Sequence, residues 1–142
     1  MKDELFFDYN IICYAYDLTE PSKREACLPL VEGVFEGSMK GIISNQVLVE
    51  IFNAFTRKLG VPSDKANLIV RSFILSKHWY KLDYNHKTVF RALENSRLFK
   101  APFLDVLISE TMKEKNISRI VTENAKDFSR IRGIIVINPF KS

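Results

Sequence analysis

Four acidic residues stand in separate segments of the chain, at places where an isolated carboxylate would be costly to bury. Asp8 directly follows an apolar run at residues 5–7. Glu50 and Asp105 each lie at the border of the apolar stripe of an expected helix, and Asp127 lies in a polar segment near a predicted helical turn. A charged group beside apolar surroundings needs a compensating partner, so we ask what these acids share.

Each acid taken alone has a simpler interpretation. Glu50 fits a solvated acid at a helix edge. Asp105 falls in the first turn of its helix, where the helix dipole favours the ionised carboxylate without any ligand. Asp8 and Asp127 can each serve as the cap of a loop or turn. These alternatives stay open for every acid considered singly.

Considered together, the acids indicate a cation site. Carboxylates that converge raise one another's pKa, and a bound divalent cation removes that conflict. Mg²⁺ and Mn²⁺ prefer carboxylate oxygen, and the cysteines and histidines show no metal-ligand spacing. We expect Cys13 and Cys27 to be buried thiols, and His78 and His86 to be structural or surface residues. Such a site can activate water for phosphodiester hydrolysis.

The composition predicts a soluble globular chain, and its basic balance is compatible with a polyanionic partner. The 142 residues are 46% hydrophobic and carry a net charge of +4, with a pI near 9.1, which favours one domain over residues 1–142. No signal peptide or membrane-spanning segment is visible, so we expect a cytoplasmic protein. Arg57, Lys58, Arg130 and Arg132 follow acid-bearing segments and are candidate phosphate contacts, although a solvated helix face is the stronger interpretation for each of them.

The elements that must position these residues alternate along the chain. Apolar runs predict strands at 5–7, 42–44, 79–82, 120–122 and 134–137. Helical spacing predicts helices at 10–16, from 21, at 46–59, 64–76, 86–98 and 102–115, with a turn at 127–130. This alternation predicts an α/β fold with a largely parallel sheet, whose sites gather at the carboxyl ends of the strands. Asp8 and Thr122 fall at such ends.

Several finer expectations follow from the same patterns. Asn10, Asn45 and Ser63 are expected to cap helices. Trp79 and Tyr80 are expected to pack in the core rather than stack on bases, and the helices between 48 and 75 are expected to bury most of their apolar positions within the chain. Ser109 is expected on the outer side of its helix.

The order and spacing of five segments resemble the PIN-domain family, in particular VapC-type toxin ribonucleases. The segments are FFDYNII at 6–12, SNQVLVEI at 44–51, FLDVLI at 103–108, TENAKDF at 122–128 and VINPF at 136–140. The resemblance covers almost the whole chain. It implies a three-layer α/β/α sandwich around a short, largely parallel sheet, and an endoribonuclease that depends on Mg²⁺ or Mn²⁺. It further implies an RNA substrate, a cognate antitoxin protein and a homodimer.

The resemblance also implies residue roles. Asp8, Glu50 and Asp105 would bind the metal, with Asp127 as the fourth acid. The supporting residues, which would orient the acids or a water, are Asn10, Thr122 and Asn124. Asn124 stands where many relatives carry the fourth acid, so either it or Asp127 completes the site. Tyr9 replaces a small hydroxyl residue that is common in relatives.

Two rival functions remain. The chain could be a non-catalytic PIN-like module that binds RNA or a protein, although the presence of all four acids argues against this. A nuclease that cuts DNA is disfavoured because the chain lacks the long insertions expected of those larger relatives.

Overall fold

The computed structural model describes residues 4–140. The strands are β1 (Glu4–Phe7), β2 (Lys40–Ser44), β3 (Trp79–Leu82), β4 (Arg119–Val121) and β5 (Ile135–Ile137). The helices are α1 (Tyr9–Tyr16), α2 (Pro21–Phe35), α3 (Asn45–Arg57), α4 (Ser63–Leu75), α5 (His86–Phe99), α6 (Phe103–Lys113) and α7 (Ala125–Phe128). Every predicted strand and helix is therefore present, with ends that shift by at most two residues.

The strands form one parallel sheet in the order β3-β2-β1-β4-β5. Phe6 of the central strand β1 pairs with Ile42 of β2 and with Ile120 of β4. After β1 the chain forms β2 and β3 on one side of β1, and it later forms β4 and β5 on the other side. In parallel sheets, ligands bind at such a change of direction, beyond the carboxyl ends of the strands. Asp8 follows β1 directly, and Thr122 follows β4.

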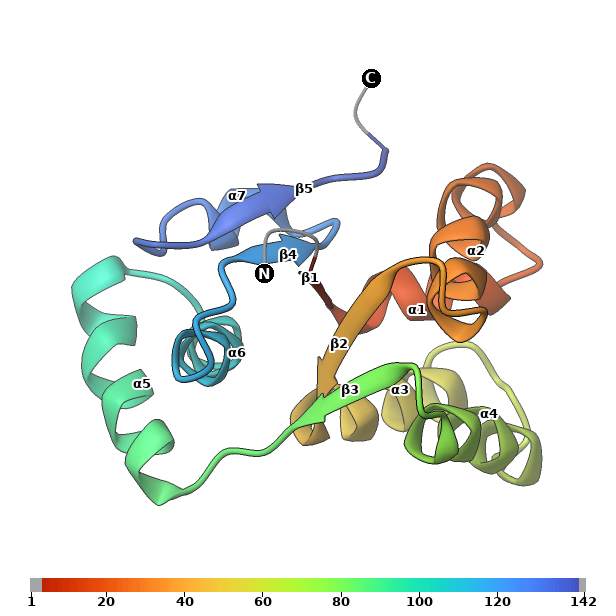
Figure 1. The fold of residues 1–142 in the computed structure, drawn as a ribbon, viewed down its shortest axis with the longest axis horizontal. Helices are drawn as coiled ribbons and strands as arrows, with labels where there is room; N and C mark the ends of the chain where they lie inside the picture. Colours follow the sequence, from red (N-terminus) through yellow and green to blue (C-terminus); the bar gives the residue numbers. More distant parts are fainter. Residues whose placement is uncertain (1–3, 141–142) are drawn as a thin grey trace.

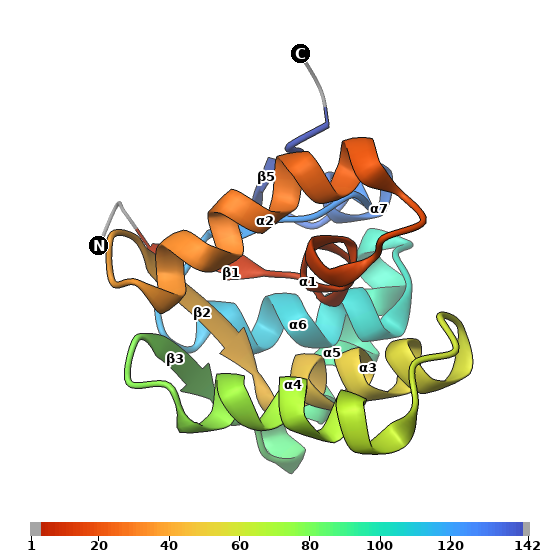
Figure 2. The same cartoon turned by 90° about the vertical axis from the view of Figure 1, so that its right-hand side faces the viewer.

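Helices cover both faces of the sheet, as predicted for an α/β/α sandwich. In Figure 1, α5 and α6 lie to the left of the sheet, while α1, α2 and α4 lie to its right. The view turned by 90° places α2 and α4 in front of the strands (Figure 2). The short α7 contacts β5 and α6. Both sheet faces are thus shielded from water, which a parallel sheet requires.

An aromatic cluster fills the core on the β3 side of the sheet. The ring of Trp79 lies 5.1 Å from that of Phe7, 5.0 Å from that of Phe73 and 5.8 Å from that of Phe35. Tyr80, which we expected in this core, is instead 63% exposed. Successive side chains of a strand point to opposite faces, so burial of Trp79 turns its neighbour outward.

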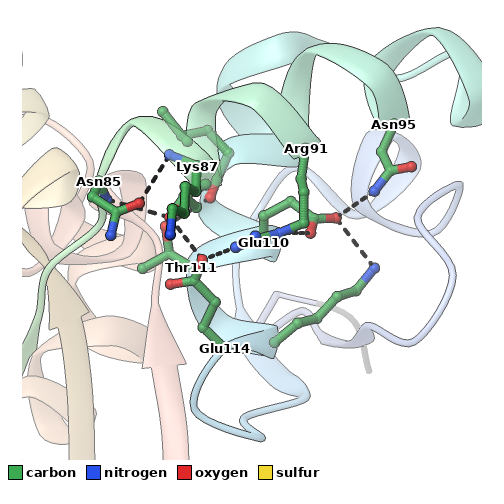
Figure 3. Close-up of polar contacts among 10 residues, drawn as sticks. Asn85, Lys87, Arg91, Asn95, Glu110, Thr111 and Glu114 are labelled. Atoms are coloured by element: carbon green, nitrogen blue, oxygen red, sulfur yellow. Dashed lines mark hydrogen bonds and ion pairs between the residues drawn. The ribbon is translucent and has the colours of Figure 1, made fainter.

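Helix α6, which carries Asp105, is attached to α5 by a polar cluster (Figure 3). The carboxylate of Glu110 is almost fully buried, accepts a hydrogen bond of 2.8 Å from Asn95 Nδ2 and lies 3.6 Å from Arg91 Nε. Arg91 also pairs with Glu114 one turn further along α6. These contacts satisfy a buried charge and fix the rotation of α6, and hence the direction of Asp105.

Three capping expectations were wrong by one or two positions. Asp8, and not Asn10, is the N-cap of α1, and Ser44, and not Asn45, is the N-cap of α3. Helix α4 begins at Ser63 itself, after Pro62. In α1 and α3 the cap is the residue that ends the strand segment in an extended conformation, because its side chain then lies beside the first free N–H groups of the helix.

Three other expectations concern burial. Cys13 and Cys27 are free, buried thiols, as predicted. Ser109 was expected on the outer side of α6 but is fully buried, where its hydroxyl donates to Asp105 O. Much of the apolar surface of α3 and α4 remains exposed, contrary to expectation, including Val49 at 67% and Leu68 at 68%. Among the described helices none combines the length and apolar character needed to cross a membrane.

Candidate functional site

Asp8 is a buried carboxylate held by donors from two segments. Its Oδ1 accepts from Tyr9 N at 2.8 Å, and its Oδ2 accepts from Thr122 Oγ1 at 2.7 Å and from Asn10 Nδ2 at 3.4 Å. Burial raises the pKa of Asp8, while these hydrogen bonds act in the opposite direction. Only 3% of the residue is exposed, so its orientation is fixed before any ligand binds.

The loop after β4 is joined to the segment that carries Asp8. Thr122 Oγ1, which donates to Asp8, also accepts from Asn124 N at 2.9 Å. Glu123 N donates to Asn10 Oδ1 at 3.3 Å. The three residues expected to support the acids, Asn10, Thr122 and Asn124, thus connect the ends of two neighbouring strands through short side chains.

Glu50 approaches the same region from the middle of α3. Burial, the nearby charge of Asp8 and that of Asp105 raise the pKa of Glu50 to about 7, and a hydrogen bond from Gln46 opposes the rise. Gln46 Nε2 donates to Glu50 Oε2 at 3.4 Å and to Leu104 O at 3.1 Å. Gln46 therefore ties α3 to the start of α6 beside the acid.

Asp105 enters from the first turn of α6. Burial and the charges of Asp8 and Asp127 raise the pKa of Asp105 to about 7, although the helix dipole alone would stabilise its charge. Asn124 Nδ2 donates to Asp105 Oδ2 at 2.8 Å, which opposes the rise. Asn124 therefore contacts one of the acids directly.

Asp127 acts on the cluster only through its charge. It raises the pKa of Asp105, and within the described part of the chain its carboxylate has no hydrogen-bond partner. Asn124 and Asp127, the two candidates for the fourth ligand, thus act on Asp105 in different ways. Asn124 holds Asp105 in place by a hydrogen bond, whereas Asp127 contributes negative charge from the next helical turn.

The charge of Asp8 acts on both Glu50 and Asp105, so the three acids share one electrostatic environment near the carboxyl edge of the sheet. Within residues 4–140, however, no three Asp, Glu, His or Cys side chains already lie close enough together to hold a metal ion. The acids therefore form an open cluster, and a closed ligand shell requires side-chain movement toward a common centre.

The side chains present nevertheless fit a hard divalent cation. Glu50 Oε1 and Gln46 Oε1 are buried without a hydrogen-bond partner among the described residues. An orphaned buried oxygen is costly and marks a place where a ligand can bind. The donors of the cluster are carboxylate and amide oxygens, which Mg²⁺ and Mn²⁺ prefer.

The sequence analysis did not identify Gln46 as part of the site. It also did not identify the polar group that Glu123 forms with Tyr14 and Lys23. Glu123 lies between Thr122 and Asn124 but turns away from the acids. Its carboxylate accepts from Tyr14 Oη at 2.7 Å and from Lys23 Nζ at 2.6 Å. Although partial burial acts to raise the pKa of Glu123, the bonds from Lys23 and Tyr14 hold it below its usual value. No sequence pattern links these three residues, which come from α1, α2 and the loop after β4.

The protein has an α/β fold, with helices on both faces of a parallel sheet. The acids at the carboxyl edge of this sheet form a candidate cation site with oxygen ligands. The model of the PIN domain matches residues 5–134, and the chain belongs to this family. No curated protein matches the sequence.

Solved structures with the same fold include toxins and toxin–antitoxin complexes. VapC20 from Mycobacterium tuberculosis, described as a toxin that cleaves the sarcin-ricin loop, is 17% identical with a TM-score of 0.72, covering 92% of this chain and 96% of that one. VapBC2 from Rickettsia felis, bound to a DNA fragment from its promoter, is 21% identical with a TM-score of 0.67, covering 95% and 98%. A toxin–antitoxin complex from Klebsiella pneumoniae is 17% identical with a TM-score of 0.66, covering 97% and 99%.

The raised carboxyl pKa values predict that the metal-free protein loses stability as pH rises. Unfolded Asp and Glu carboxyls titrate near pH 4, whereas Glu50 and Asp105 titrate near 7 in the folded chain. Between these values the folded state binds more protons, so the contribution of both groups to the free energy of unfolding falls as pH rises through this window. Thermal unfolding in chelator at pH 5 to 8 should show a decline, and Mn²⁺ should raise Tm more at pH 8 than at pH 5.

The matched control is the double variant Glu50→Gln, Asp105→Asn, which cannot ionise at either position. Its Tm should depend less on pH and respond less to Mn²⁺. Identical pH and Mn²⁺ dependence in the two proteins would contradict the assignment of this instability to Glu50 and Asp105.

Proposed function

We propose that the protein is an endoribonuclease that hydrolyses RNA phosphodiester bonds with Mg²⁺ or Mn²⁺, and that residues 1–142 act as a single nuclease domain. The observation that carries the proposal is the set of three acids at the carboxyl edge of the sheet: burial raises the pKa of Asp8, Glu50 and Asp105, and the charge of Asp8 adds to the rise at Glu50 and Asp105. Negative charge concentrated in this way serves no purpose in packing and is relieved by a divalent cation. The family assignment and the fold shared with VapC toxins support the same reaction class.

The proposed ligands are Asp8, Glu50 and Asp105, with Asp127 as the fourth acid. A bound divalent cation would activate a water and stabilise the charge that develops on the phosphodiester. Thr122 holds Asp8 at a fixed orientation through its 2.7 Å hydrogen bond, and Asn124 does the same for Asp105. These bonds limit the number of side chains that must reorder when the cation binds.

Glu50 Oε1 has no hydrogen-bond partner within the described residues, so it is free to bind the cation. The cation would then lower the pKa of a bound water, which would attack the phosphodiester. Because water is the nucleophile, no covalent intermediate with the protein forms.

We further propose that the chain is the toxin of a toxin–antitoxin pair and forms a homodimer. An exposed apolar groove of about 580 Å³ between α3 and α4 supports a protein partner. Leu48, Val49, Phe52, Val70 and Ile74 line it. Solved complexes with the same fold contain an antitoxin, which makes the product of an adjacent reading frame the first candidate.

Substituting Asp105→Asn should abolish RNA cleavage while leaving the fold intact. The variant keeps the size of the side chain but removes one ligand charge, so the rate should fall about 100-fold or more. Cleavage of RNA and DNA oligonucleotides would be measured during a Mn²⁺ titration, with circular dichroism as the check on folding. Asp64→Asn, on the exposed start of α4, is the matched control.

Undiminished cleavage by Asp105→Asn would contradict the assigned site. A wild-type protein that binds RNA but shows no Mn²⁺-dependent turnover would instead favour the non-catalytic module. Preferential cleavage of DNA would contradict the substrate class.

The partner proposal is tested in the groove. Ile74→Glu places a charge on a half-exposed apolar position and should weaken the complex with the protein encoded directly upstream by about tenfold, measured by calorimetry. Leu93→Glu, a similarly exposed position on α5, is the control and should bind normally. Equal affinity of both variants would show that the antitoxin binds elsewhere.

The homodimer is tested by mass. Light scattering of the wild-type chain at micromolar concentration should give the mass of two chains. A mass near 16.5 kDa, that of one chain, would contradict this part of the proposal.

A further inference from the structure

A small hollow adjoins the acidic cluster on the side of α3. Its volume is about 230 Å³, and it opens to solvent between the start of α1, the second half of α3 and the start of α6. Its lining consists of Tyr9, Glu50, Asn53, Ala54, Arg57, Lys58 and Leu104. Glu50 is thus shared between the acidic cluster and this hollow, so a molecule held at the acids extends directly into it.

The spacing along α3 places opposite charges on one face of the helix. Glu50 and Arg57 are seven residues apart, which is two helical turns and about 10 Å along the axis. The intervening Asn53 and Ala54 line the floor between them. An RNA strand bound at the acids would therefore lie close to Arg57. The nucleotide next to the scissile bond can span the separation between Glu50 and Arg57.

The two cations of the hollow are available for an anionic ligand. Arg57 and Lys58 are both exposed, and within residues 4–140 neither forms an ion pair with an acidic side chain. By contrast, Lys23 pairs with Glu123, and Arg130 Nη1 donates to Lys100 O at 3.0 Å. Arg57 and Lys58 are the basic residues that line the hollow, and neither has an acidic partner among residues 4–140.

The remaining walls suit the base of a nucleotide. Lys58 Nζ lies 5.8 Å from the centroid of the Tyr9 ring, which is partly exposed on the hollow. Leu104 faces the same space and is 52% exposed. Aromatic rings beside cations bind single-stranded nucleic acid by stacking on bases while the cations hold the backbone, with little dependence on sequence.

We propose that this hollow is the subsite for the nucleotide adjoining the scissile phosphodiester of single-stranded RNA, with its phosphate on Arg57 and Lys58 and its base on Tyr9. This subsite rests on the proposed nuclease function, since it gives the acids their substrate. The base contact also gives a role to Tyr9, the large side chain next to Asp8 where relatives often have a small hydroxyl residue.

The test measures RNA binding without turnover. The probe is a fluorescein-labelled, single-stranded 12-nucleotide RNA, and the protein carries Asp105→Asn in chelator, so that no cleavage occurs. In this background Arg57→Gln, Lys58→Gln should raise Kd, measured by fluorescence anisotropy, about tenfold. Loss of two phosphate contacts should also reduce the slope of log Kd against log salt by about 1.4, or about 0.7 per contact.

A matched double variant separates local contacts from net charge. Lys77→Gln, Arg97→Gln removes the same two charges from exposed positions outside the hollow, on the loop after α4 and on α5. It should leave Kd and the salt slope close to those of the parent. Equal weakening by the two double variants would overturn the subsite, because charge alone would then explain binding.

Variants at Tyr9 test the base contact. Tyr9→Phe keeps the ring and should bind RNA as the parent does, whereas Tyr9→Leu should raise Kd several-fold. Equal affinities of the two variants would overturn the stacking role. Because these binding measurements need no cleavage, a wild-type protein that fails to cut RNA would contradict the proposed function, while the variants would still show whether the hollow binds RNA.

Discussion

Burial of neighbouring carboxylates at the carboxyl edge of the sheet is the constraint on which the proposed site depends. Burial raises the pKa of Asp8, Glu50 and Asp105, and the charge of Asp8 adds to the rise at Glu50 and Asp105. Such an arrangement costs stability in the metal-free chain, and the surrounding elements hold each acid from a different direction. Under the proposed function, a divalent cation would relieve this cost on binding.

Rigid supports lie immediately behind the acids. The loop after β4 supplies Thr122 to Asp8 and Asn124 to Asp105, and Glu123 between them is tied outward to Lys23 and Tyr14. Helix α6 is fixed in rotation by the ion pairs that Arg91 of α5 forms with the buried Glu110 and with Glu114 (Figure 3). Preorganised ligands lose less conformational entropy on binding, so these distant contacts belong to the chemistry of the site.

The fold was largely predictable because local patterns and the tertiary structure agree. Apolar runs and helical spacing located every strand and helix, and their alternation required a parallel sheet. The errors arose where one local pattern fits two structures. Ser44 and Asn45 are both good caps, and only the direction of the chain leaving β2 selects Ser44. Trp79 and Tyr80 are both aromatic, and only the choice of inward face buries the first and exposes the second.

By itself the sequence determined which residues are acids, that they stand at strand ends and helix edges, and that their order matches the PIN family. Those features are local, and they follow from residue type and spacing along the chain. Only the tertiary structure decided which groups share an environment. It gave Asn124 rather than Asp127 the contact with Asp105, left oxygens of Gln46 and Glu50 unpaired, and set Arg57 and Lys58 in the same hollow as Glu50. The physical reason is that burial and electrostatic coupling depend on distance in space, and residues far apart in sequence acquire that distance only when the sheet and helices pack.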